Sequence, residues 1–171
     1  MTVFTGKSVY DAAVCGLICI LRKPKLSAER MHVDDISTEL KRVEAARIVA
    51  AEQLQQLYEL FLDKIGESNA QIFNIHMMML EDEDYNGSIE GMIRSEQVNA
   101  EYAVARTSDV FAQMLEAMDN EYMRARSADV RDVSNRLLSI LTDTPMDFPW
   151  VPENSVVCAL SLIHISEPTR L

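Results

Sequence analysis

The sequence predicts a mainly α-helical protein, in which an antiparallel helical bundle is inserted between two apolar ends that form strands of a separate sheet. Apolar residues between about residues 36 and 141 recur at steps of three and four, the period of one face of a helix. The connections between these segments are short, which is typical of neighbouring helices that pack antiparallel. The two ends lack this period and carry short runs rich in valine and isoleucine, which favour strands.

The N-terminal region, residues 1–25, is expected to supply one or two of these strands. Its apolar run at residues 12–21 (AAVCGLICIL) could pass for the core of a signal peptide, but it lacks a small-x-small cleavage site. The run is also too short to span a bilayer as a helix. We therefore interpret it as a buried strand, ended by Pro24.

The bundle is expected over residues 26–144, and its first helix is long. Asp34 and Asp35 both offer an N-cap for this helix, and Gly66 offers its end. The predicted core positions of the helix are Ile36, Leu40, Val43, Ala50, Leu54, Leu57 and Phe61, with a gap in the period at Arg47.

A methionine-rich helix is expected next, over about residues 69–80. The carboxylates at residues 81–84 and the pair Asn86-Gly87 then predict a break before a shorter helix. Two further helices are expected over about residues 100–117 and 120–141, with Asp119 as the cap of the second. The predicted core positions are Ile89, Met92 and Ile93 in the short helix, Ala103, Val110, Phe111, Met114 and Met118 in the next, and Tyr122, Val130, Val133, Leu137 and Leu141 in the last.

The C-terminal region is expected to return to the sheet. Residues 145–160 are interpreted as a proline-rich linker followed by a strand that starts near Val156. Residues 161–171 (SLIHISEPTRL) break the preceding pattern and resemble translated vector sequence. We therefore expect them to be a non-native tail and the chain to be truncated near Ala159.

Composition excludes several classes of function. The formal charge of −11 opposes binding to nucleic acids and to anionic membranes, and it suits a basic protein partner. The three cysteines form no CxxC pair, which predicts a reducing, cytoplasmic setting. The three histidines show no metal-ligand spacing, and glycine-rich phosphate loops are absent from the sequence, so no metal or nucleotide site is expected.

Residues 72–85 (IFNIHMMMLEDEDY) are the stretch with the clearest functional signal. Phe73, Met77 and Leu80 share one helical stripe. Ile75, Met78 and Met79 lie off this stripe, so packing one face of the helix cannot bury them all. A flexible methionine surface beside a block of carboxylates predicts a docking site for a basic partner. An ordinary core followed by a solvated helix start would give the same spacing. His76 is either a hydrogen-bonding group at such an interface or a satisfied, half-buried histidine.

This stretch and residues 119–141 (DNEYMRARSADVRDVSNRLLSIL) together resemble the N-terminal part of Enzyme I, the phosphoenolpyruvate–protein phosphotransferase of the bacterial sugar phosphotransferase system. The resemblance covers about residues 5–159. It implies an α/β phosphohistidine domain with an inserted helical bundle that docks HPr, a phosphocarrier with a basic rim around an apolar patch. The implied HPr-binding residues are Glu67, Met78, Asp82, Leu115, Tyr122 and Arg126, which match the family's residue types, and Met79, Asp84, Tyr85 and Met123, which keep their character.

The resemblance also implies what this chain does not do by itself. The phosphoaccepting histidine of the family belongs to a Gly-Gly-x-Thr-Ser-His-like motif that this sequence lacks. Phosphoenolpyruvate and magnesium bind in a further domain, through which the full-length protein is expected to form a homodimer. We therefore expect no catalytic residue, no cofactor and no activity in this chain alone. The alternative is a separate helical adaptor whose methionine-rich face binds an amphipathic helix.

Overall fold

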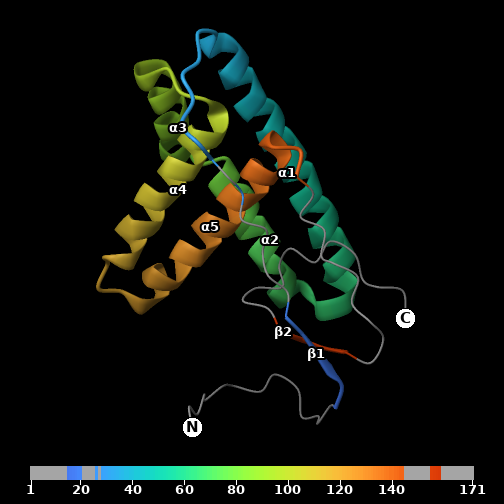
Figure 1. Ribbon diagram of the computed structural model, residues 1–171. Coiled ribbons are helices and arrows are strands. Elements are labelled where there is room, and N and C mark those ends of the chain that lie inside the picture. Colours follow the sequence, from blue (N-terminus) through green and yellow to red (C-terminus); the bar gives the residue numbers. More distant parts are fainter. Residues whose placement is uncertain (1–14, 21–25, 27, 145–154, 159–171) are drawn as a thin grey trace. The chain divides into compact units, whose positions relative to one another are not determined.

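The computed structural model describes residues 15–20, 26, 28–144 and 155–158, without the side chains of residues 63–65, 68, 69, 157 and 158. The chain divides into two units, residues 1–23 with 147–171, and residues 24–146. Within the described residues there are five helices and one two-stranded sheet, so the predicted mainly helical fold is confirmed (Figure 1). The predictions for residues 1–14, 145–154 and 159–171, including the non-native tail, lie outside the described residues.

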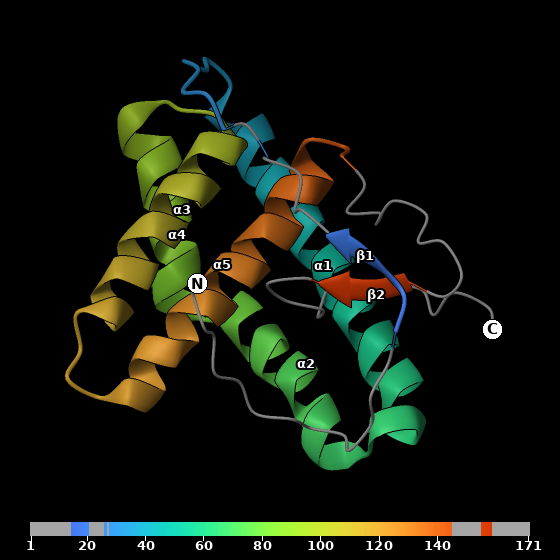
Figure 2. The ribbon, with the colours of Figure 1, turned by 60° about the horizontal axis from the view of Figure 1, so that its bottom comes forward.

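Helices α1 (Ile36–Ile65) and α2 (Glu67–Leu80) form a hairpin with one residue between them (Figures 1 and 2). Asp35 caps α1, because its side chain accepts a hydrogen bond from the backbone N–H of Thr38 at 3.1 Å. Gly66 joins the helices with a φ of 78°, a left-handed conformation that glycine adopts without steric cost. The predicted cap and the predicted end of this helix are both confirmed.

The core of α1 largely follows the predicted stripe. Val43, Ala50, Leu54 and Leu57 are buried, whereas the other predicted core positions, Ile36, Leu40 and Phe61, are only half-buried. The apparent gap at Arg47 is filled by Ala46, one position earlier, which is also buried. A small residue continues the stripe there.

Helix α3 (Glu83–Glu96) begins earlier than expected. The break lies at Glu81 and Asp82, and Asn86-Gly87 is inside the helix, so the prediction of a break at that pair is wrong. Asp82 caps α3 by accepting from the backbone N–H of Tyr85 at 2.8 Å. Asn86 is accommodated because its buried side-chain amide donates to the carbonyl of Leu80, at the end of α2, at 2.8 Å.

Helices α4 (Ala100–Glu116) and α5 (Glu121–Leu141) pack closely against each other (Figures 1 and 2). The predicted inner face of α4 is largely wrong, since Val110, Met114 and Met118 are exposed and Phe111 is half-buried. The residues that α4 buries are mostly small, because small side chains allow helix axes to approach closely. These are Ala100, Ala103, Val104, Thr107, Ser108 and Ala112.

Helix α5 follows its predicted core more closely. Val130, Val133 and Leu137 are buried as predicted, but Tyr122 is exposed. The residue that caps the helix is Asn120 and not Asp119, since the Asn120 side chain accepts from the backbone N–H groups of Tyr122 and Met123. The prediction was therefore one residue out at the start of the helix.

Strands β1 (Leu17–Ile20) and β2 (Ser155–Cys158) pair in parallel, with Leu17 opposite Ser155 and Ile20 opposite Cys158. A parallel pair requires a long crossover connection, and here the helices lie between the two strands in the chain. The strands therefore belong together although the sequence separates them, as the insertion prediction requires. The prediction of a buried strand is wrong for β1, because Leu17 and Ile20 are exposed.

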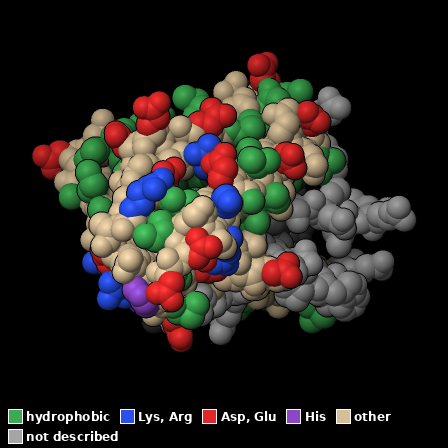
Figure 3. Space-filling model, turned by 90° about the horizontal axis from the view of Figure 1, so that it is seen from above, with side chains coloured by type: hydrophobic (Ala, Val, Ile, Leu, Met, Phe, Trp, Pro, Cys, Tyr) green, Lys and Arg blue, Asp and Glu red, His purple; other side chains and the backbone are tan. Residues whose placement is uncertain are grey.

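Charged side chains are distributed over the face of the molecule that is seen from above (Figure 3). Seen from above, acidic side chains are spread across the face among apolar ones, and basic side chains lie both near its centre and at its lower left edge (Figure 3). The excess of negative charge in the composition, −11, is therefore not gathered in a single acidic patch on this face.

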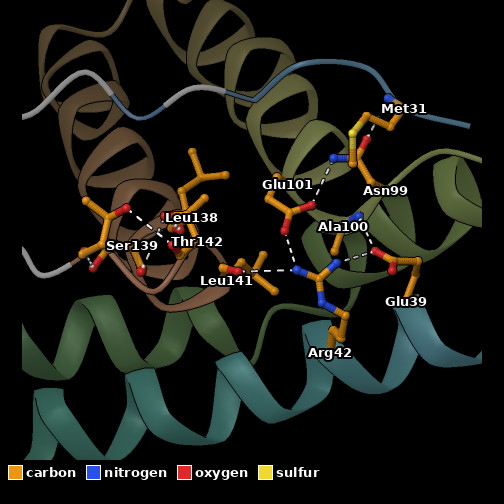
Figure 4. Close-up of polar contacts among 11 residues, drawn as sticks. Met31, Glu39, Arg42, Asn99, Ala100, Glu101, Leu138, Ser139, Leu141 and Thr142 are labelled. Carbon is orange, nitrogen blue, oxygen red and sulfur yellow. Dashed lines mark hydrogen bonds and ion pairs between the residues drawn. The ribbon is translucent and has the colours of Figure 1, made fainter. Parts of the chain in front are cut away.

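A polar cluster ties α1 to the start of α4 and the end of α5 (Figure 4). Glu39 on α1 accepts from the backbone N–H of Ala100 at 2.8 Å and from Arg42 at 2.7 Å. Arg42 also donates to Glu101 and, at 3.2 Å, to the carbonyl of Leu141. Burial works against the charge on Glu101, but the hydrogen bonds and charge of Arg42 lower the pKa of this carboxyl below its ordinary value. One guanidinium thus joins three helices.

Candidate partner-binding surface

The methionine-rich end of α2 carries apolar side chains that are not all buried in the core. Phe73 and Leu80 are buried as predicted, but His76 takes the core place expected for Met77, which is half-buried. Met78 is 70% exposed. The second half of α2 therefore presents a large apolar side chain to solvent, which is typical of an interaction surface.

A pocket of about 170 Å³ opens beside this helix end, among α2, α3, α4 and α5. Most of its walls are apolar, and one carboxylate contributes to them. The lining residues are Met79, Asp82, Tyr85, Phe111, Met114, Leu115, Met118, Val130 and Val133. Four elements that are separated in sequence thus form a single apolar recess.

Tyr85 lies in the wall of this pocket with its side chain turned inward. Its hydroxyl is 2.7 Å from the Oγ atom of Ser134, and its ring meets Phe111 edge-on with the centroids 5.5 Å apart. Burial raises the pKa of Tyr85 to about 12. Since Tyr85 is only 6% exposed, the expected outward contact by this residue is corrected to a supporting position within the wall.

The acidic cluster stands at the junction of α2 and α3. Glu81, Asp82, Glu83 and Asp84 are all exposed, and Asp82 both caps α3 and lines the pocket. Carboxylates in the first turn of a helix are stabilised by the helix dipole. The pocket therefore has negative charge along one edge.

Tyr122 and Arg126 form a pair on the first turns of α5. The guanidinium carbon of Arg126 lies 4.6 Å from the centre of the Tyr122 ring, and Arg126 also donates a hydrogen bond to the Tyr122 hydroxyl. Arg126 forms an ion pair with Asp129 at 2.9 Å. The hydrogen bond to Tyr122 and the ion pair raise the pKa of the guanidinium above its ordinary value. The ring of Tyr122, 63% exposed, is therefore held against a charged plane.

Behind this pair, His76 of α2 faces Asp129 of α5. The His76 Nε2 atom lies 3.6 Å from Asp129 Oδ1, slightly beyond hydrogen-bond distance, and has no hydrogen-bond partner among the described residues. His76 is 1% exposed, so it is buried and not half-buried. Burial opposes the charge of Asp129, but His76 and Arg126 outweigh it and lower the pKa of this carboxyl.

The structure places four of the ten predicted site residues in one pocket and two others in a separate contact pair. Met79, Asp82, Tyr85 and Leu115 share the pocket, while Tyr122 and Arg126 are in contact with each other. Of the remaining positions, Met78 and Asp84 are exposed and Met123 is half-buried. Glu67 stands apart at the first turn of α2, roughly 16 Å along the helix axis from Met78.

Sequence reasoning missed part of α4. Phe111, Met114 and Met118 were assigned to the bundle core, yet they line the pocket. Phe111, Met114 and Leu115 form a second apolar stripe on a helix that already has a stripe of small residues, and Met118 continues this stripe just beyond the end of α4. Two apolar stripes on one helix indicate that one of them is not buried in the bundle core.

Two kinds of site find no support in the described part of the chain. Among the described residues, no three histidine, cysteine, aspartate or glutamate side chains lie close enough together to hold a metal ion. Among the same residues, none of the helices combines the length and apolar character needed to cross a membrane.

Comparisons with known proteins give a consistent picture. A family model described as "PEP-utilising enzyme, N-terminal" matches residues 5–126. A phosphoenolpyruvate-protein phosphotransferase from Geobacillus stearothermophilus is 42% identical over 170 residues, which cover 96% of this chain and 29% of that protein. The protein of the same name from Listeria monocytogenes is 36% identical over 166 residues, covering 97% of this chain and 29% of that protein.

The fold is also similar to a solved structure. An NMR solution structure of Enzyme I matches with a TM-score of 0.71 and 25% identity, over 90% of this chain and 64% of that chain. This chain spans about 29% of the length of the two phosphotransferases from Geobacillus stearothermophilus and Listeria monocytogenes.

Proposed function

The chain belongs to the family described as PEP-utilising enzyme, N-terminal, and from this we propose that its helical unit docks HPr, the histidine-bearing phosphocarrier of bacterial sugar uptake. The observation that carries the proposal is the apolar pocket with exposed Met78 nearby and carboxylates along one edge. HPr presents the complement of such a surface, an apolar patch within a basic rim. The proposed docking surface consists of Met78, Met79, Asp82, Asp84, Leu115, Tyr122, Met123 and Arg126. Tyr85 supports the wall of the pocket, and Glu67 belongs to the proposed contact residues but lies away from the others, at the start of α2.

In the proposed reaction the complete protein takes a phosphoryl group from phosphoenolpyruvate onto its own histidine and passes it to a histidine of HPr. The contribution of this chain is to hold HPr in the right orientation, which is a large part of catalysis in a two-protein transfer. Magnesium and phosphoenolpyruvate would bind to a further domain of the complete protein. Inactivity of the chain alone, a cytoplasmic location and dimerisation of the complete protein are parts of the same proposal.

Apolar and charged residues have different roles in this interface. Met78, Met79, Leu115 and Tyr122 supply affinity, because large apolar side chains at the centre of an interface carry most of the binding energy. The carboxylates at the α2–α3 junction steer the encounter and set the orientation of the basic partner. Loss of an anchor should therefore change the dissociation rate, whereas loss of a carboxylate should change the association rate.

The Met78→Glu variant tests the proposed dock. A carboxylate at this exposed position replaces an apolar anchor, and we expect HPr binding to weaken by about 2 kcal/mol or more, roughly thirtyfold. Calorimetric titration with HPr from Geobacillus stearothermophilus measures the change. The matched control is Ile48→Glu, the same kind of substitution at an exposed apolar position of α1, which should bind as the unaltered chain does.

The outcomes separate two questions. If the unaltered chain does not bind HPr, the docking function is wrong. If it binds and Met78→Glu binds equally well, the dock lies elsewhere on the chain.

A further inference from the structure

We propose that His76 is a positioning residue for the docking surface, acting from the interior through Asp129 and Arg126 on the exposed ring of Tyr122. The proposal rests on the proposed docking function, because it concerns the order of side chains on that surface. It identifies a role for a residue that does not touch the partner.

The burial of His76 needs an explanation beyond packing. The side chain is 1% exposed and lies on α2 between the buried positions Phe73 and Leu80, where an aliphatic residue would fill the space without polar atoms. A buried polar atom without a hydrogen bond is costly, and His76 Nε2 lacks one among the described residues. The group that this nitrogen faces is the carboxylate of Asp129, at 3.6 Å.

The two oxygens of Asp129 serve different partners. Oδ1 faces His76 of α2, while Oδ2 accepts from Arg126, one turn earlier on α5, at 2.9 Å. In this proposal Nε2 carries the ring proton and directs its N–H towards Oδ1, an electrostatic contact at 3.6 Å that is slightly longer than a hydrogen bond. Rotation of the carboxylate would break the hydrogen bond with Arg126 or lengthen the electrostatic contact with His76. Its orientation is therefore set from inside the helical unit.

Arg126 transmits this orientation to the surface. Its guanidinium lies between Asp129 and Tyr122, with its carbon 4.6 Å from the centre of the ring and a hydrogen bond to the hydroxyl. Arginine is among the most rotamer-rich side chains, so it stays in one conformation only where fixed partners hold it. The Tyr122 ring, 63% exposed, is ordered as a consequence. Ordering before binding improves affinity, because the entropy of immobilising these side chains is not lost on docking.

The sharpest test compares two residues of similar length at position 76. His76→Met fills the space but removes the N–H, so we expect HPr to bind about five- to tenfold more weakly, the cost of ordering one or two rotamer-rich side chains. His76→Gln restores an N–H donor and should recover most of that loss. A purely structural role would not distinguish the two variants in this way.

A spectroscopic measurement on the chain without a partner completes the test. Side-chain NMR of the Arg126 Nε–H group should show a dispersed, ordered signal in the unaltered chain and in His76→Gln. His76→Met should move the signal towards that of a free arginine, and Asp129→Asn should do the same if His76→Met does not fold. In a Tyr122→Ala background the effect of His76→Met on binding should vanish, because the ring that His76 is proposed to order has been removed.

The results discriminate clearly. Equal binding by His76→Met and the unaltered chain, or equal weakening by both substitutions with no change at Arg126, overturns the positioning role. If the unaltered chain fails to bind HPr, the docking function is wrong, and the Arg126 signal alone then shows whether His76 orders the pair.

Discussion

Glu101 shows how a single carboxylate can stay ionised while largely covered by protein. Its side chain is 12% exposed, and Arg42, which contacts it, also contacts Glu39 and the carbonyl of Leu141. Burial alone would raise the pKa of Glu101, but the Arg42 contacts lower it. The charge on Glu101 is therefore a condition for joining α1, α4 and α5 at this point.

Glu101→Gln should lower the free energy of unfolding by about 1–2 kcal/mol at neutral pH, because a charge-assisted hydrogen bond becomes a neutral one. The folded-state pKa lies below the ordinary value of 4.5, so the contribution is complete above pH 4.5 and disappears as the pH falls through the folded-state pKa. Urea unfolding across this range, followed by circular dichroism, measures the difference between the two chains. It should be constant at higher pH and shrink on acidification.

The matched control is Glu96→Gln, which removes the exposed ion pair between Arg30 and Glu96. Exposed pairs contribute little, so this variant should change stability by less than about 0.5 kcal/mol at every pH. A pH-independent difference for Glu101→Gln would contradict the importance of its charge.

At the scale of elements, α4 has an unusual beginning. Asn99 precedes the helix but makes no capping hydrogen bond with its own side chain, which instead accepts from the backbone N–H of Met31 and donates to Glu101. The first free N–H of the helix, that of Ala100, is satisfied by Glu39 of α1. A distant helix thus supplies the cap, so the start of α4 depends on the fold of the whole bundle.

Glu39→Ala should therefore destabilise the bundle more than loss of a local cap. We expect a decrease of about 2–3 kcal/mol, because a buried N–H and part of Arg42 lose their acceptor together. Asp35→Ala, which removes the exposed local cap of α1, should cost about 1 kcal/mol. Urea unfolding compares the two variants. Equal losses would mean that Glu39 acts on α1 alone.

The two apolar stripes of α4 show why element faces are difficult to assign from sequence. The large side chains Phe111, Met114 and Met118 have the pattern of a core, but the bundle buries the small stripe containing Ala103 and Ala112. Both stripes satisfy the helical period. Which stripe is buried depends on the side chains of the helices that pack against α4, and the periodicity of α4 does not contain this information.

At the scale of the whole molecule, the net charge of −11 acts on the rate of association with a basic partner. We expect the rate constant for association with HPr to fall about tenfold between about 0.05 and 0.5 M salt, because exposed charges are screened. Stopped-flow measurements follow this rate. The double variant Glu83→Gln, Asp84→Asn should reduce the salt dependence, and an association rate independent of salt would contradict electrostatic steering.

Several features follow from the sequence because they depend on residues close together in the chain. The helical class, the cap at Asp35, the end at Gly66 and the exposure of Met78 beside a carboxylate cluster all arise from local spacing. The Arg126–Asp129 pair is also local, since the two residues are three positions apart on one helix.

Other features were decided by the tertiary structure. The hydroxyl of Tyr85 points inward to Ser134, and the buried ring of His76 faces Asp129. Strand β1 pairs with β2, which is distant in the sequence. The pocket exists only where α2, α3, α4 and α5 meet. Local periodicity determines which residues share a helix face, but the neighbours that cover that face come from distant parts of the chain, so only the folded arrangement decides which face is buried.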